Sequence, residues 1–491
     1  MQYLLGVDFG GGASKATLID TNGTFIASNT VEYPTSYPKQ GYAEQDPADW
    51  YNAIKKNIAA LLKKSNIYAD DIIALCLDAA THTAVLLDND FQLLRPAIYW
   101  TDSRRIRESE ILRNKYGDLV LSKTLHQADT IWTLPQLMWV KENEPEIWKK
   151  TSKIMFAKDY VRYLFTGDYC TDYIEAQGSM MFDYNTMSWS RELCDIIGFD
   201  TAKLPKAVKP ADIVGNITKT ASEDTGLSQD TKVICGTTDT ALEVFAAGAV
   251  RKGQMTVKLA TAGRICVITD RAYPNQHLIN YSHVVDGLWY PGTATKSCAA
   301  SYRWYRDTFG RDYKDMDDTA AKIPPGSEGV IFHPYLNGEL TPYADPKLCA
   351  SFTGVRSGHT KAHFNRAVLE GVAYSLLDCM NALEDIGIPH NEEAVIIGGG
   401  SKSPLWRQIV SDALNISLKQ VQFSDSSYGA ALLAGVAIGV FDGYEEAVEK
   451  SNKVISTTNP IAENIKIYAE SFEIYKAVHD ALAPIYARVK I

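Results

Sequence analysis

The sequence lacks the features of a membrane or secreted protein. Its 491 residues include no apolar run of about 18 residues, so we expect no membrane-spanning helix. No basic segment followed by an apolar one stands at the N-terminus, which predicts that there is no signal peptide. The eight cysteines form no CxxC pair and most stand among apolar residues, so we expect reduced, buried thiols in a cytoplasmic protein.

Motifs of several common enzyme classes are also missing. There is no GxxxxGK[ST] loop, which excludes a Walker A site, and no GxSxG nucleophile elbow. The glycine triplets do not fit GxGxxG with a helix at the expected place, which argues against a Rossmann dehydrogenase. Cysteine and histidine show no metal-ligand spacing. The net charge of -10 argues against a broad nucleic-acid-binding surface, although a phosphate site needs only local positive potential.

What is present is an α/β pattern long enough for two domains. Hydrophobic residues make up 46% and charged residues 22%, which are ordinary globular values. Residues 3–8 and 15–20 read as strands around a turn at glycines 10–12. Helical spacing follows at residues 46–64. Further strands are predicted at residues 71–77 and 84–87, and further helices at 133–141 and 154–165.

A similar pattern starts again near residue 232. We expect a strand at 232–235, a polar turn at 236–239 and a helix at 241–247. A second strand–turn–strand follows at 255–259 and 265–269, which is weak support for a duplication because the likeness is in pattern more than in letters. We place the domain boundary at glycine-flanked residues 247–253, so the predicted domains are 1–247 and 248–491.

Two glycine-rich loops could bind a nucleotide. In the first, Asp8 ends a strand, three glycines follow, and backbone N–H groups of such a turn form a concavity for anionic oxygens. Asp8 could hold Mg²⁺ through water and Lys15 could balance phosphate charge, but a plain glycine-rich hairpin fits the loop equally well. The other loop, residues 398–401, connects a strand to a helix, and its three glycines favour a nucleotide contact over a tight turn.

Other polar residues stand where chemistry could occur. Asp239 lies between a strand and a helix, where it could accept the proton of a substrate hydroxyl; from spacing alone a helix N-cap explains it better. His82 lies between two apolar strands, and a structural role is again the better local explanation. Trp100 and Asp102 stand beside Arg104, as an aromatic face and charges that a sugar could use, or as a core residue beside a surface ion pair.

Taken in order, these segments resemble the FGGY family of carbohydrate kinases over nearly the whole chain. Each motif is weak, but their co-occurrence in this order is specific. Besides the loops, the resemblance rests on these segments: GYAEQDP at 41–47, WTDSR at 100–104, KDY at 158–160, TGD at 166–168, GELTP at 338–342, RAVLEG at 366–371 and YGAA at 428–431. Within the family, the EQDP segment and the WTDSR box look most like xylulokinases, with gluconate kinases close behind.

The resemblance implies two RNase-H-like domains of the actin, Hsp70 and hexokinase type, which flank a cleft and transfer phosphate from Mg-ATP to a small open-chain sugar. Asp239 is then the catalytic base, and the sugar side consists of Thr81, His82, Trp100, Asp102 and Asp239. Asp8 and Asp239 are the implied Mg²⁺ residues, through water. ATP is implied to contact Asp8, Gly10, Gly11, Gly12, Ala13, Ser14, Lys15, Thr261, Ala262, Gly263, Gly398, Gly399, Gly400 and Ser401. A cytoplasmic homodimer without nucleic-acid or membrane partners is also implied.

This chain departs from the family pattern at several positions. Gly11 replaces a hydroxyl residue, the second loop reads ATAGR where GTSG is usual, and Arg264 adds a bulky side chain there. Thr240 and Leu340 replace the usual Asn and Arg, and the segment around His82 is not the xylulokinase one. D-xylulose is therefore the first substrate hypothesis, with another ketopentose, a polyol or gluconate as alternatives. The alternative from another class is a sugar-sensing pseudokinase that binds ligands without transfer.

Overall fold

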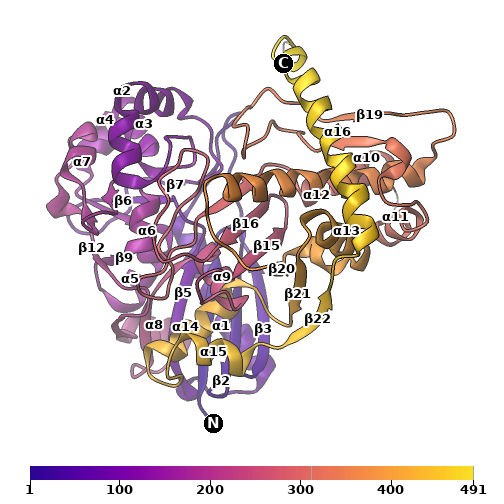
Figure 1. The fold of residues 1–491 in the computed structure, drawn as a ribbon. Coiled ribbons are helices and arrows are strands. Elements are labelled where there is room, and N and C mark those ends of the chain that lie inside the picture. Colours follow the sequence, from indigo (N-terminus) through magenta and orange to yellow (C-terminus); the bar gives the residue numbers. More distant parts are fainter. Residues whose placement is uncertain (311, 490–491) are drawn as a thin grey trace.

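Two six-stranded mixed sheets, in which the first four strands in sequence have the same order, form the frame of the molecule (Figure 1). The computed structural model describes residues 1–310 and 312–489. The first sheet has the order β13-β14-β5-β1-β2-β3, and the second has the order β17-β16-β15-β20-β21-β22. In each sheet, three adjacent strands run parallel and the remaining strands pair antiparallel. The predicted architecture of two RNase-H-like domains is therefore confirmed.

The strands of the first sheet are β1 (Tyr3–Phe9), β2 (Ala13–Asp20), β3 (Phe25–Glu32), β5 (Ile72–Ala79), β13 (Ile213–Asn216) and β14 (Lys232–Thr238). Those of the second are β15 (Met255–Leu259), β16 (Gly263–Val267), β17 (Gly292–Thr295), β20 (Glu393–Ile397), β21 (Ser417–Val421) and β22 (Val454–Thr458). Short two-stranded pairs contain β4 (Glu44–Gln45), β6 (Ala84–Leu87), β7 (Ala97–Ile98), β8 (Lys153–Phe156), β9 (Cys170–Asp172), β10 (Phe182–Asp183), β11 (Ser188–Trp189), β12 (Lys206–Val208), β18 (Ile331–His333) and β19 (Ser351–Thr353).

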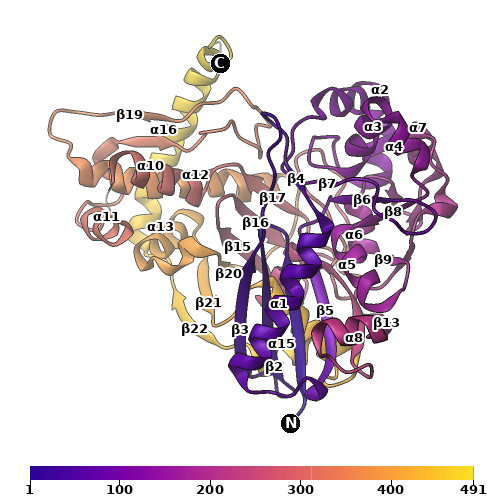
Figure 2. The ribbon, with the colours of Figure 1, turned by 180° about the vertical axis from the view of Figure 1, so that it is seen from behind.

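The helices surround these sheets on both faces (Figures 1 and 2). Those of the first half are α1 (Pro47–Ser65), α2 (Ile106–Thr124), α3 (Thr133–Asn143), α4 (Pro145–Lys150), α5 (Ala157–Thr166), α6 (Tyr173–Gly178), α7 (Arg191–Ile197), α8 (Lys219–Thr225) and α9 (Asp239–Ala246). Those of the second half are α10 (Ala299–Phe309), α11 (Tyr313–Ala320), α12 (Lys361–Asp385), α13 (Pro404–Leu414), α14 (Ser426–Ala437), α15 (Tyr444–Ser451) and α16 (Ala462–Tyr486).

Helices α1 and α14 cover opposite faces of the first sheet. Alternate residues of β1 serve the two faces: Leu5 and Val7 pack with the apolar face of α1, whereas Leu4 packs with α14. Gly6 makes the second contact close, since a Cβ there would lie 2.0 Å from the Ser427 carbonyl oxygen. Helix α14 therefore lies directly against the central strand of the first sheet.

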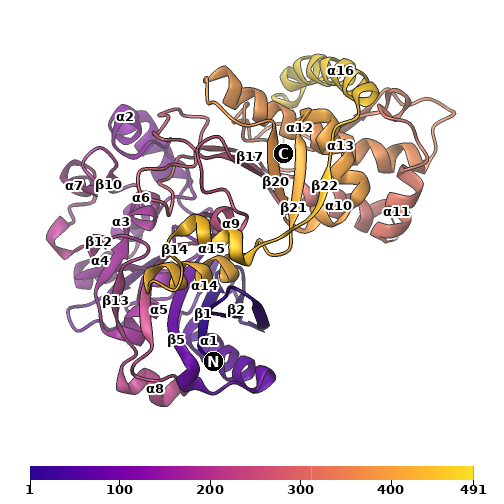
Figure 3. The same ribbon diagram turned by 60° about the horizontal axis from the view of Figure 1, so that its bottom comes forward.

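Helices α14 and α15 come from beyond the predicted boundary at residue 247 and return to the N-terminal sheet, beside β14 and α9 (Figure 3). The second sheet has its own core, which α12 and α13 build with β15 and β20. The division into 1–247 and 248–491 stays a prediction; two helices of the second segment pack in the first core.

Most predicted elements are confirmed, and two predictions are wrong in part. Residues 154–156 are the end of strand β8, paired with β6, and helix α5 begins only at Ala157. A buried apolar run has no periodicity that separates strand from helix, which explains the error. The predicted turn at 236–239 is instead an irregularity within β14, which continues to Thr238; Gly236 supplies it with a φ of 72°.

All eight cysteines are free thiols; seven are buried and Cys349 is half-buried. In the ranges 1–310 and 312–489, no helix is both long and apolar enough to cross a bilayer.

Candidate functional site

Three carboxylates gather at the carboxyl ends of three adjacent parallel strands. Asp8 in β1 stands opposite Asp78 in β5, and Asp239 follows the last residue of β14 directly. The strands neighbour each other in the order β14-β5-β1, so parallel pairing brings all three ends to one edge of the sheet. Ligands of open α/β sheets bind at this edge. Sequence reasoning found Asp8 and Asp239 but missed Asp78.

Asp78 is a buried carboxyl group without a hydrogen-bonding partner. Its side chain is 0% exposed, and both of its oxygens lack a partner in the described structure. Burial raises its pKa well above the usual range, with the nearby Asp8 adding to the effect. Burial likewise raises the pKa of Asp8 to about 7. Among the described residues no cationic side chain forms an ion pair with Asp8 or Asp78, so the two carboxyl groups are a candidate site for a positively charged ligand.

The first glycine loop connects β1 to β2 above this pair. Gly12 has a φ of 107°, and a side chain at Gly10 would collide with Ala80, so both positions require glycine. Gly11 is exposed and has open space beside it. Lys15 is half-buried and forms an ion pair of 3.0 Å with Asp425, the N-cap of α14. The loop thus exposes its backbone at Gly11 and places Lys15, fixed by its ion pair with Asp425, near Asp8.

Ser14 and Ala13 of the predicted phosphate loop are less exposed than Gly11. Ser14 is fully buried, and Asn57 of α1 donates hydrogen bonds to its carbonyl oxygen (2.8 Å) and its hydroxyl (3.2 Å). Its side chain therefore points into the domain and fixes β2 against α1. Ala13 is half-buried at the start of β2. The predicted ATP contacts of this loop stay predictions, with residues 11–13 as its accessible part.

Asp239 occupies the first position of α9. The N-cap is Thr238, so the N-cap explanation of Asp239 is wrong. The backbone N–H and the hydroxyl of Thr240 both donate to its Oδ1. No group in the described part of the chain donates to Oδ2. Asp239 is half-buried, and it lies at the N-terminal end of α9.

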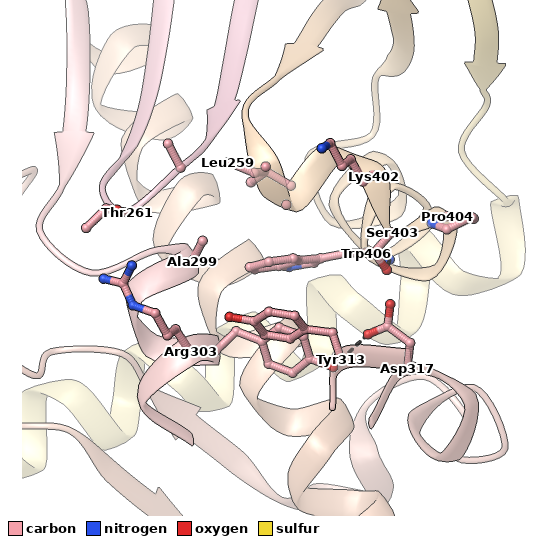
Figure 4. A pocket seen from close by; sticks show the side chains of 14 residues that line it. Leu259, Thr261, Ala299, Arg303, Tyr313, Asp317, Lys402, Ser403, Pro404 and Trp406 are labelled. Carbon is pink, nitrogen blue, oxygen red and sulfur yellow. Dashed lines mark hydrogen bonds between the residues drawn. The ribbon is translucent and has the colours of Figure 1, made fainter. Parts of the chain in front are cut away.

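A cavity of about 640 Å³ joins the second and third predicted loops (Figure 4). Thr261 lines one side, and Gly399 and Gly400 line the other. Gly398 has a φ of 90° and would place a Cβ 2.6 Å from the Leu259 carbonyl oxygen, so its glycine brings the two loops together. Residues predicted from separate motifs therefore share one pocket.

Aromatic rings form the walls of this pocket. Trp406 lies above Tyr313 in Figure 4, and Tyr302 contacts both rings, with centroids 5.4 Å from each. The Tyr302 hydroxyl donates to Asp317 (2.6 Å), and Arg303 and Lys402 stand on opposite sides of the opening. A flat apolar slot with cationic residues at its mouth suits a planar base carrying phosphates. Sequence reasoning missed these aromatic residues.

The remaining predicted loop residues lie at the edge of the pocket. Ala262 is exposed and Gly263 is buried at the start of β16. The Ser401 hydroxyl donates to the Gly398 carbonyl (2.7 Å), which holds the short helical turn Gly399–Lys402 in shape. The buried residues Gly263 and Ser401 thus support the loops from within. The predicted contacts of Ala262, Gly263 and Ser401 with ATP stay predictions.

His82 lies on the other side of Asp239, in a buried aromatic group. Its φ is 68°, and its Nδ1 bonds the Gly178 carbonyl (2.8 Å), which places the proton on Nδ1. Nε2 then accepts from the Tyr281 hydroxyl (3.2 Å). Burial lowers the pKa of His82 to about 4, so the ring is neutral at pH 7. His126 stacks on Trp132, which packs edge-on against His82.

Thr81 and the backbone of His82 share one carboxyl group. The Thr81 hydroxyl and the His82 N–H both donate to Glu175 Oε1, at 3.0 and 3.2 Å. Glu175 is buried, and burial raises its pKa well above the usual range. This contact fixes the segment that carries His82.

The WTDSR segment at residues 100–104, predicted to contact the sugar, is fixed by hydrogen bonds and ion pairs within the protein. Asp102 is 1% exposed; it accepts from the Ala43 N–H (2.6 Å) and pairs with Arg104 (2.8 Å). Arg104 also pairs with Glu44 (2.8 Å). The GYAEQDP and WTDSR segments are thus packed together, with the Asp102 carboxylate occupied. Trp100 is 37% exposed, and the predicted sugar contacts of both residues stay predictions.

A small change at Gly399 tests the pocket. Its Cβ direction is open, so Gly399→Val should leave the melting temperature within about 1 °C of wild type while its side chain enters the slot. We expect the KM for ATP to rise about tenfold and the KM for the sugar to stay constant. Gly358→Val, at another open position, is the matched control. An unchanged KM for ATP would contradict the assignment of the pocket.

Two domains of related topology, with glycine loops in both and carboxylates at a sheet edge, have the architecture of the actin-type ATPases, a class that includes sugar kinases. The FGGY N-terminal carbohydrate-kinase domain matches residues 3–246, and the FGGY C-terminal domain matches residues 234–438. The chain belongs to the FGGY family of carbohydrate kinases and is therefore a phosphotransferase.

Individual relatives agree with this assignment. The chain is 32% identical to the xylulose kinase of Bacillus subtilis (strain 168) over 486 residues, 98% of this chain and 97% of the relative. The crystal structure of ligand-bound xylulose kinase from Lactobacillus acidophilus superposes with a TM-score of 0.93 at 26% identity, covering 99% of this chain and 100% of that one. Gluconate kinase from the same organism gives 0.93 at 27% identity, with 99% of each chain covered.

Proposed function

We propose that this kinase transfers the γ-phosphate of ATP to a terminal hydroxyl of a small open-chain sugar, with D-xylulose, giving D-xylulose 5-phosphate, as the first candidate. The observation that carries the proposal is the position of Asp239. It continues the sheet edge that holds Asp8 and Asp78, and one of its oxygens has no partner in the described residues. Similarity to xylulose kinases supports the choice of sugar.

In this proposal, adenosine occupies the aromatic pocket and the phosphates extend towards the first and second loops. Backbone N–H groups of residues 10–13 bind oxygens of the transferring group, and Lys15 adds positive charge. The sugar lies on the His82 side. Asp239 Oδ2 accepts the proton of the terminal hydroxyl as that oxygen attacks the phosphorus in line. Closure of the domains excludes water, which limits wasteful hydrolysis of ATP.

The carboxyl pair fits Mg²⁺, which kinases of this class use. Asp78 has two unpartnered oxygens beside Asp8, and oxygen is the donor that Mg²⁺ prefers. In the described ranges no three His, Cys, Asp or Glu side chains form a complete metal site, and Mg²⁺ commonly uses one or two carboxylates with phosphate oxygens. Asp8 and Asp78 would hold the ion, which when bound offsets charge on the phosphoryl group. Asp239 then stays free for the proton.

The acceptor can be identified with a substrate panel. A coupled ADP-release assay with Mg-ATP compares D-xylulose, D-ribulose, L-xylulose, L-ribulose, erythritol, xylitol, glycerol and gluconate. We expect the highest kcat/KM with D-xylulose, and with a margin of at least about tenfold over polyols. A higher value for gluconate or a polyol would replace the proposed substrate and keep the reaction.

The alternative of a sugar-sensing pseudokinase rests on Gly11, Ala262 and Arg264, which depart from the family pattern. Against it, Asp8, Lys15 and Asp239 are all present, which supports phosphoryl transfer. Binding of ATP and sugar without ADP release from any acceptor would favour the sensor.

A further inference from the structure

Arg264 is a cation next to the predicted sugar side of the site, and no counter-ion for it is found among the described residues. It follows Gly263 in β16, between Lys258 on β15 and Ala294 on β17. Lys258 is paired with Glu243 across the two domains. Within the described ranges, no carboxylate lies within ion-pair distance of Arg264, and its guanidinium stands 5.7 Å from the centroid of the Tyr290 ring. Lys258 is therefore neutralised by an ion pair, whereas the neighbouring Arg264 faces an aromatic ring.

The unused donors of Arg264 are specific atoms. Nε and Nη2 are buried and have no hydrogen-bonding partner in the described structure. Buried donors without a partner are rare, and leaving one unpaired costs about 1–3 kcal/mol, more when the group is charged. The departure at position 264 thus places two costly N–H groups beside the reaction centre, which indicates that a ligand pairs with them.

The surroundings of Arg264 are those of the acceptor. The Arg264 guanidinium faces the Tyr290 ring, and it is near enough to His82, His126 and Asp239 for electrostatic interaction. Burial lowers the pKa of both histidines, so they are neutral and do not repel a guanidinium at pH 7. Tyr281 connects His82 to the Tyr290 ring, which stacks on it at 5.8 Å. Arg264 therefore shares its surroundings with Asp239 and His82.

The geometry of a guanidinium selects what can pair with it. Nε–H and Nη2–H lie on one edge and point in parallel, so they fit two oxygens held close together in one plane. A 2-ketose offers such a pair in its carbonyl oxygen and the neighbouring hydroxyl, and a sugar acid offers one in its carboxylate. A polyol has no trigonal carbon and fits this edge less well.

We propose that Arg264 is the specificity-determining residue that binds the carbonyl end of the acceptor, opposite the hydroxyl that faces Asp239. This inference rests on the proposed sugar-kinase function. It assigns the substrate class as an open-chain sugar with two oxygens at or next to a trigonal carbon. The ketose is the first candidate, and an aldonate supplies the same chemistry from a second source.

The test compares D-xylulose with xylitol, which differs only at the carbonyl carbon, in wild type and Arg264→Met. We expect kcat/KM for D-xylulose to fall about 10- to 100-fold in the variant, because charge-assisted hydrogen bonds are lost. The value for xylitol should change less than about threefold, so the preference for the ketose collapses. Arg264→Lys keeps the positive charge but lacks the two parallel N–H donors of the guanidinium. It should therefore recover only a small part of the kcat/KM for D-xylulose that Arg264→Met loses. Arg271→Met, an exposed arginine in the same domain, is the control.

Three further results of the same experiment would support or overturn the role of Arg264. If D-xylonate is the better acceptor of wild type and loses that advantage in Arg264→Met, the oxygen pair is a carboxylate and the inference stands. Equal losses for D-xylulose and xylitol, or no loss for either, would overturn it. If no acceptor releases ADP, the proposed function fails, and calorimetric titration of the same sugars into both proteins tests the inference by Kd. A constant KM for ATP and a constant melting temperature show that the variant is folded.

Discussion

Replacing Asp239 with asparagine is expected to lower kcat by about 10²- to 10⁴-fold, because the amide cannot accept the proton of the attacking hydroxyl. The change keeps the shape of the side chain and an acceptor for Thr240, which donates to Oδ1. Asp8, Asp78 and the aromatic pocket are not altered, so the Kd for Mg-ATP should stay within about threefold. Steady-state kinetics with D-xylulose and fluorescence titration with nucleotide measure the two quantities.

Asp230→Asn is the control for this variant, since Asp230 is an exposed aspartate before the same strand. Its kcat should equal that of wild type. If Asp239→Asn turns over at more than about a tenth of the wild-type rate, Asp239 is not the base. If nucleotide binding is lost along with turnover, the residue belongs to the phosphate site, and the assignment of Asp78 as the partner of Asp8 must change.

Replacing Asp78 with asparagine should raise stability and lower activity together. Asp78 carries a carboxyl group in a fully buried position, so its folded-state pKa lies above its unfolded value. Such a group destabilises the folded state increasingly as the pH rises above the unfolded pKa of about 4. The uncharged amide removes this cost, by about 1–3 kcal/mol at pH 7.5. We expect the melting temperature of the ligand-free protein to rise by a few degrees.

The stability gained by Asp78→Asn should depend on pH. The stability difference between Asp78→Asn and wild type should be larger at pH 8 than at pH 5, since wild type approaches the neutral form as the pH falls. In kinetics, the Mg²⁺ concentration for half-maximal rate should rise about 10- to 100-fold. Asp90→Asn, an exposed control, should change neither quantity. A lower melting temperature at pH 8, or unchanged Mg²⁺ dependence, would show that Asp78 has a structural role.

Local patterns predicted the parts of the site that single segments form. The glycine triplets mark turns that need positive φ or close backbone approach, as Gly12 and Gly398 show. Asp8 and Asp239 end buried apolar strands. Asp78 ends the strand Ile72–Ala79 in the same way, so the same signal could have found it.

The aromatic pocket and the sugar side could not be predicted from local patterns. Tyr302, Tyr313 and Trp406 come from three helices up to about a hundred residues apart, and each one resembles an ordinary core residue in sequence. His126 and Trp132 meet His82 only after the chain folds back. Such contacts depend on tertiary packing, which the period of hydrophobic residues does not encode.

The strand order gives stronger support for duplication than the sequence does. Strand–turn–strand units at 3–20 and 255–269 share few residues, yet each begins a six-stranded sheet in which the first four strands in sequence have the same order. The return of α14 to the first sheet had no visible sign in the sequence beyond the small residues that allow close packing. Gly429 is one of these, because a Cβ there would lie 2.3 Å from the Leu242 carbonyl oxygen in α9.

The most direct test of the central claim is ³¹P NMR of the protein with Mg-ATP and D-xylulose, followed over time. We expect the γ-phosphate signal of ATP to decrease while ADP and a sugar phosphate monoester appear in equal amounts. Asp239→Asn should slow this change at least a hundredfold. Formation of inorganic phosphate alone, or an unchanged ATP spectrum in the presence of every acceptor of the panel, would contradict it.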